Sequence, residues 1–151
     1  MFDVKKFMSA QFVAREEDVP VPDMKEFFGD DELPVWRVRG LTGQELFFAL
    51  EAAERNRKID AVLKGLTSEV MAELTSAVQK LVGDRGEVTD ALAKKLEMFA
   101  IGSVAPEADI ELAVKICRTH PVEFATIATT IEGLTGKGHE TKKKPGASGT
   151  T

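Results

Sequence analysis

One stretch of the sequence decides the fold: Trp36-Arg-Val-Arg-Gly-Leu-Thr-Gly-Gln-Glu45, followed by Leu46-Phe-Phe-Ala-Leu-Glu-Ala-Ala-Glu-Arg-Asn-Arg57. Its first residues alternate, with Trp36 and Val38 on one face and the arginines on the other, which is typical of a strand. From Thr42 the apolar residues recur at the spacing of a helix. We therefore expect a strand that leads directly into a long helix.

The start of this helix carries a capping box, Thr42-Gly-Gln-Glu45. In such a box the threonine hydroxyl accepts a hydrogen bond from the Glu45 amide, and the glutamate carboxylate accepts one from the Thr42 amide. Beyond the box, Leu46, Leu50 and Ala53 fall on one side of the helix, because successive residues are about 100° apart. These three residues are the predicted inward face.

Helical periodicity continues through most of the chain after this point. Apolar stripes with their cap and stop residues predict further helices at about residues 68–81, 90–102, 110–120 and 121–134. The stripe of the last helix consists of Phe124, Ile127, Ala128, Ile131 and Leu134. The predicted fold class is therefore mainly α: a compact helical bundle of five or six helices with a short N-terminal β-hairpin or extended segment.

The first forty residues lack a helical pattern. Ala10–Arg15 is predicted to form a short strand that pairs with the strand at 34–39. Between them, residues 16–32 form an acidic loop that holds eight acids and one lysine. Three apolar anchors in this loop are expected on one short helical turn: Met24, Phe27 and Phe28.

These patterns divide the 151 residues into three parts of one domain. Residues 1–41 are an extended or β segment that packs on the bundle, residues 42–134 are the helical domain, and residues 135–151 are a disordered basic tail. The net charge is −5, and the tail holds four lysines against one acid, so the body is strongly acidic. An acidic body argues against nucleic-acid binding.

Charged residues interrupt the N-terminus too early for a signal peptide, and no apolar run is long enough to span a bilayer. We therefore expect a cytoplasmic protein without a membrane partner.

The sequence offers few groups for chemistry, with one cysteine and two histidines. Cys117 and His120 form a Cys-x-x-His pair, but no second pair exists to complete a zinc site, and the cysteine lies on an apolar stripe. Gly40 and Gly43 flank a helix start, yet neither of the common glycine-rich phosphate-binding motifs occurs. We expect no catalytic residue, no metal and no cofactor, and hence no enzyme.

Two adjacent aromatic residues, Phe47 and Phe48, lie outside the predicted inward face and need cover from elsewhere. Phe47 lies about a quarter turn from the predicted inward face, and Phe48 lies near the opposite side of the helix. Cover for Phe48 has two possible sources: the N-terminal segment, through Phe27, Phe28 or Trp36, or another protein.

Two arginines of the predicted strand are the other candidates for partner binding. Arg37 and Arg39 project from the face opposite Trp36, where they either pair with the acidic loop or contact a partner. The candidate partner-binding residues are Arg37, Arg39, Phe47 and Phe48.

The stretch also resembles a known family. Trp36–Glu45, followed by Leu46 and Glu51-Ala-Ala-Glu-Arg55, is similar to a segment of siphophage tail assembly chaperones, where an apolar strand, an R-x-L-T-x-x-E turn and an Ala/Glu/Arg helix recur. This resemblance implies a protein that binds and solubilises the tape measure protein and helps recruit tail tube subunits. It also implies a bacterial host cytoplasm as the location and absence from the mature virion.

Other functions stay open. The chain is also compatible with another phage structural component, such as a head–tail connector or minor tail protein, or with a small helical enzyme or regulator. A homo-oligomer is a further possibility.

Overall fold

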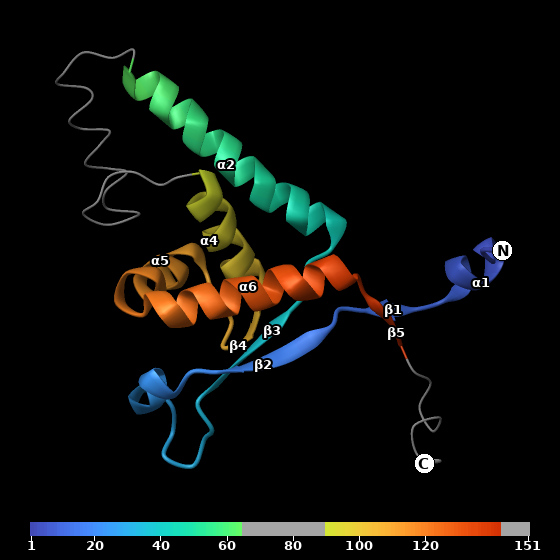
Figure 1. Cartoon of the computed structure of the whole chain (residues 1–151), viewed down its shortest axis with the longest axis horizontal. Coiled ribbons are helices and arrows are strands. Elements are labelled where there is room, and N and C mark those ends of the chain that lie inside the picture. Colours follow the sequence, from blue (N-terminus) through green and yellow to red (C-terminus); the bar gives the residue numbers. More distant parts are fainter. Residues whose placement is uncertain (65–89, 143–151) are drawn as a thin grey trace.

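The computed structural model describes residues 1–64 and 90–142. Its helices are α1 (Val4–Ser9), the 3-10 helix η1 (Pro22–Phe27), α2 (Gly43–Lys64), α4 (Asp90–Gly102), α5 (Ile110–Thr119) and α6 (Pro121–Lys137). Its strands are β1 (Phe12–Val13), β2 (Glu16–Pro20), β3 (Val35–Arg39), β4 (Ser103–Ala105) and β5 (Glu140–Thr141). Figure 1 shows their arrangement.

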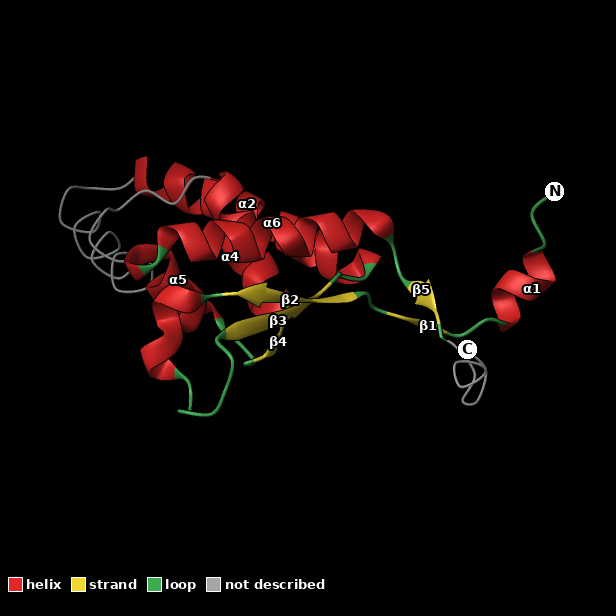
Figure 2. Cartoon of the chain, turned by 60° about the horizontal axis from the view of Figure 1, so that its bottom comes forward, coloured by secondary structure: helices red, strands yellow, loops and turns green. Residues whose placement is uncertain are grey.

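The prediction of a mainly α bundle is wrong, because the fold is mixed α/β. It contains a three-stranded antiparallel sheet of order β2-β3-β4, and a second, two-stranded sheet that pairs β1 with β5. Figure 2 shows α2, α4 and α6 on one side of the three-stranded sheet. The sheet supplies Val19, Trp36 and Val38 to the core, so it is part of the packed interior rather than an appendage.

The strand that pairs with β3 is not the predicted one. β2 lies within the acidic loop, and its register places Asp18 opposite Arg37 and Val19 opposite Trp36. Only Val19 of this strand is buried, while the other four residues are exposed. Such a strand shows no alternation in the sequence, because cross-strand charge pairs support it where apolar residues usually would. The predicted strand at Ala10–Arg15 contributes only β1.

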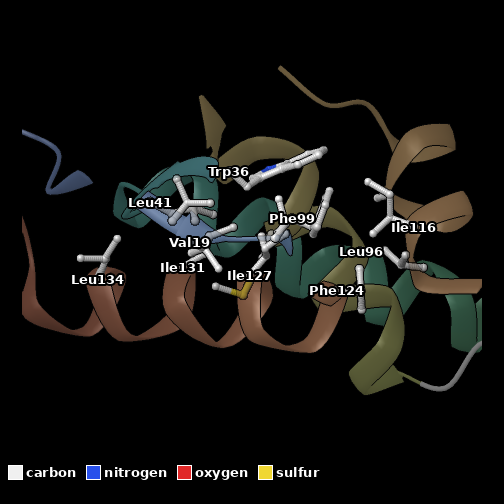
Figure 3. Close-up of a cluster of buried hydrophobic side chains, with 14 of the residues drawn as sticks. Val19, Trp36, Leu41, Leu96, Phe99, Ile116, Phe124, Ile127, Ile131 and Leu134 are labelled. Carbon is white, nitrogen blue, oxygen red and sulfur yellow. The ribbon is translucent and has the colours of Figure 1, made fainter. Parts of the chain in front are cut away.

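The helices that pack on the sheet agree well with their predicted positions. α6 buries the complete predicted stripe from Phe124 to Leu134. The ring of Phe124, near the N-terminus of α6, stacks on the ring of Phe99 in α4 with 5.2 Å between the ring centroids. The ring centroids of Phe99 and Trp36 are 5.5 Å apart. Figure 3 shows these rings within one cluster of buried side chains. The core therefore joins α4, α6 and the sheet. The predicted helix at about 68–81 falls outside the described residues.

The predicted inward face of α2 is wrong. Ala49 and Ala52 are buried, whereas Leu46 is half-buried and Leu50 is exposed. The side chain of Ala53 falls outside the described residues. α2 packs along α4, and small side chains at a helix contact allow the two axes to approach closely. The helix is therefore rotated so that Ala49 and Ala52 face inward, Leu46 packs at the edge of the core and Leu50 faces solvent.

Order extends beyond residue 135, where the disordered tail was predicted to begin. α6 continues through Gly136 to Lys137 and ends at Gly138, whose φ of 73° suits a glycine at a helix end. β5 follows and pairs with β1. Residues 143–151 of the predicted tail lie outside the described residues. In the described ranges, no helix is long and apolar enough to cross a membrane.

Candidate interaction surface

The corner between β3 and α2 is held against the end of α6. The N–H of Gly40 donates to the carbonyl oxygen of Arg15 at 2.9 Å, and a Cβ at this position would lie 3.0 Å from the carbonyl carbon and oxygen of Leu134. The next residue, Leu41, is buried, and its N–H donates to Oγ1 of Thr135 at 2.9 Å. Such a contact is tighter than most Cβ contacts, so glycine suits this close approach of two backbones.

The predicted capping box is confirmed. The Thr42 N–H donates to Oε1 of Glu45 at 2.9 Å, and the Glu45 N–H donates to the Thr42 hydroxyl at 3.1 Å. Arg39 adds a two-armed ion pair to the same carboxylate, with Nη1–Oε1 and Nη2–Oε2 distances of 2.8 and 2.7 Å. The hydrogen bonds from Arg39 are the main reason that the pKa of Glu45 is lowered to about 2. Glu45 therefore has a second structural role that the motif alone does not show.

Both candidate arginines find partners within the chain. Arg37 donates from Nε to Oδ1 of Asp18 at 2.8 Å and from Nη2 to Oδ2 at 3.3 Å, across the β2–β3 pairing. These hydrogen bonds lower the pKa of Asp18 and raise the pKa of Arg37. Arg37 thus pairs with the acidic loop, as the intramolecular interpretation predicts, whereas Arg39 pairs with Glu45 instead. Both interactions explain the arginines without another protein.

The two adjacent phenylalanines remain open to solvent. The side chain of Phe47 is 67% exposed and that of Phe48 is 48% exposed. Of the three residues expected to cover Phe48, Trp36 is buried in the core and Phe28 packs against the core cluster, while Phe27 is itself exposed. The N-terminal segment therefore leaves a large part of both rings accessible.

These rings are part of a larger surface on the first turns of α2. We call the α2 face the set of exposed residues Phe47, Phe48, Leu50, Glu51 and Glu54. Residues three or four apart are neighbours on a helix surface, so Phe47 adjoins both Leu50 and Glu51. In the described part of the chain, neither Glu51 nor Glu54 makes an ion pair. The α2 face therefore combines aromatic rings with free carboxylates, which suits a basic amphipathic helix.

The side chains considered for catalysis or metal binding do not come together in one site. Burial raises the pKa of the half-buried Cys117 thiol, which disfavours the reactive thiolate. The Nδ1 atom of His120 lies 2.8 Å from the hydroxyl of Thr119. Among residues 1–64 and 90–142, no three His, Cys, Asp or Glu side chains are grouped to hold a metal ion. The α2 face is the surface with the clearest capacity to bind something.

Sequence reasoning missed a second exposed apolar segment, at the N-terminus. Asp3 accepts a hydrogen bond from the Lys6 N–H and caps α1, a helix in which no residue is buried. The sequence did contain one signal for α1, because Asp3, a residue that often caps helices, directly precedes Val4-Lys-Lys-Phe-Met-Ser9.

No family model matches the chain, and no match was found among curated proteins or solved structures.

Proposed function

We propose that this protein is a tail assembly chaperone of a long-tailed phage, and that it holds amphipathic helices of the tape measure protein on the α2 face. The observation that carries the proposal is the exposure of Phe47 and Phe48 on the first turns of α2. The similarity of Trp36–Glu45 to the corresponding segment of such chaperones supports the choice of client. On this proposal the protein is not an enzyme.

The surroundings of the α2 face suit it to binding without rearrangement. The start of α2 is tied to α6 through Leu41 and Thr135, and to β3 through Arg39 and Glu45. A surface that is already ordered loses little conformational entropy when it binds, so more of the contact energy appears as affinity. Burial of the Phe47 and Phe48 rings would supply most of that energy. The carboxylates of Glu51 and Glu54 would select clients with lysine or arginine beside their apolar stripe.

The proposal also includes the later steps of tail assembly. The chaperone acts in the cytoplasm of the bacterial host, passes the tape measure protein to tail tube subunits and is left behind when the tail is complete. Finding the protein in purified virions would instead favour a head–tail connector or minor tail protein.

The test is co-expression with the tape measure protein of the same phage. The wild-type chain is expected to raise the soluble fraction of the client severalfold, and the F47S/F48S variant is expected to lose most of this effect. The matched control is L33S/V122S, which removes two exposed apolar side chains away from the α2 face. The proposal fails if F47S/F48S is folded by circular dichroism and still solubilises the client as well as the control does.

A further inference from the structure

The N-terminus forms an arm that lies apart from the body of the molecule. We define the arm as residues 1–13, which comprise α1 and β1. Figures 1 and 2 both show α1 beyond the β1–β5 ribbon, away from the other helices. The base of the arm is fixed, because β1 pairs with β5 and the Arg15 side chain donates to the Gly138 carbonyl oxygen at 3.1 Å.

The arm carries an uncovered cluster of aromatic rings. The ring centroids of Phe2 and Phe7 are 5.3 Å apart, and those of Phe7 and Phe12 are 5.1 Å apart. Phe2 is nevertheless 68% exposed and the neighbouring Met8 is 76% exposed. An isolated helix as short as α1 is only marginally stable in water. An exposed apolar patch on an ordered segment usually marks a contact with another molecule.

The charges of the arm complement those of the α2 face. Lys5 and Lys6 lie exposed on α1, and no ion pair involves either of them in the described part of the chain. The third charged residue of the arm, Asp3, is engaged in capping the helix. The α2 face presents Phe47 and its neighbours beside the free carboxylates of Glu51 and Glu54. One chain thus holds an exposed aromatic basic segment and an exposed aromatic acidic surface.

We propose that the arm of one copy of this chain lies on the α2 face of a second copy, and that the exchange is reciprocal. Within one copy, α1 is joined to β1 only through Ala10 and Gln11. Ser9 and Phe12 are three Cα–Cα steps apart and lie within about 11 Å of each other, so α1 stays beside the ribbon while β1 is paired. A second copy is under no such restriction. Reciprocal exchange buries two arms at once and closes the assembly as a two-fold dimer.

This inference concerns the chain alone and does not depend on the identity of a client. Its relation to the proposed function is that the arms would shield the α2 face until a client displaces them.

The test is sedimentation equilibrium of the full-length chain and two charge-reversed variants. The wild type is expected at twice its mass of 16.5 kDa. In a dimer of K5E/K6E alone or of E51K/E54K alone, each arm and the α2 face it contacts carry charges of the same sign. The dissociation constant of each variant alone is therefore expected to rise at least about tenfold. An equimolar mixture of the two is expected to recover the wild-type affinity, because every arm then meets a face of opposite charge.

The control is K115E/K137E, which makes the same change in net charge as K5E/K6E on exposed residues outside the arm and is expected to remain as dimeric as the wild type. Circular dichroism confirms that each variant is folded. A monomeric wild type, an assembly of any other size, charge-reversed variants that stay dimeric, or a mixture that stays monomeric would each overturn the exchange.

Discussion

Glu45 joins two elements through one carboxylate, since it caps α2 and pairs with Arg39 of β3. The capping box was readable from the sequence, because it depends only on residues three apart within one helix turn. The pairing with Arg39 was not, because it depends on how sharply the chain bends between the strand and the helix. The sequence therefore suggested Arg39 for partner binding without showing that it pairs with Glu45 at the corner.

The lowered pKa of Glu45 predicts an acid-sensitive contribution to stability. The carboxyl ionises more readily in the folded chain, so this contribution is complete above its usual pKa of 4.5 and is lost as the pH falls towards about 2. E45Q is expected to reduce the free energy of unfolding by about 1 to 2 kcal/mol at neutral pH. Urea titrations between pH 2 and 7 measure this difference.

The comparison variant for this prediction is D18N, whose carboxylate is paired but exposed. It is expected to change stability much less than E45Q does, because solvent screens an exposed ion pair. If the E45Q and wild-type curves stay equally far apart from pH 7 down to pH 2, the pH-dependent role assigned to Glu45 is incorrect.

At the scale of elements, long helices were predictable and the sheet was not. α6 buries a stripe that recurs at helical spacing, so its core face follows from the sequence alone. β4 has three residues and directly follows α4, which leaves no room for an alternating pattern. α2 shows a different difficulty: its large apolar residues suggested the inward face, but close packing on α4 places its alanines there. Of the apolar residues on the α2 face, the sequence therefore predicted the exposure of Phe47 and Phe48 but not that of Leu50.

The contact between the β3–α2 corner and α6 should not tolerate a side chain at residue 40. G40A places a Cβ 3.0 Å from backbone atoms of Leu134, and these atoms cannot move without shifting the buried end of α6. We expect the free energy of unfolding to fall by about 1 to 3 kcal/mol, as for other overpacked sites. Thermal or urea denaturation followed by circular dichroism provides the measurement.

Gly43 offers a matched control three residues later, because nothing lies within 4 Å of a Cβ built there. G43A is expected to be neutral or to stabilise α2 by up to about 1 kcal/mol, since alanine is a better helix former. Equal effects of G40A and G43A would show that the close approach to α6 has no energetic importance.

At the scale of the whole molecule, the chain consists of a packed α/β body and a projecting arm. The helical part of the body was predictable because its helices carry clear apolar stripes, but the sheet that completes the core was not. The arm was not, because no residue of α1 is buried, so it has no apolar stripe that packs on the body.

This division predicts that aromatic residues of the arm and of the body differ sharply in their effect on stability. Under dilute conditions where the chain is monomeric, F2S/F7S is expected to change the free energy of unfolding by less than about 0.5 kcal/mol, because both residues are exposed. F124A is expected to reduce it by about 3 to 5 kcal/mol, because that ring is buried in the core. Urea denaturation compares the two, and a large loss of stability in F2S/F7S would show that the arm packs on its own body.

The placement of Trp36 has a practical consequence for optical measurements. It is the only tryptophan in a chain without tyrosine, and its buried indole N–H donates to the hydroxyl of Ser103, the first residue of β4, at 2.9 Å. Its fluorescence therefore reports on one interior position. Binding at the α2 face should leave the emission maximum unchanged, whereas unfolding should move it to longer wavelength. The intrinsic signal thus separates a ligand that docks on this protein from one that disrupts it, without any added dye.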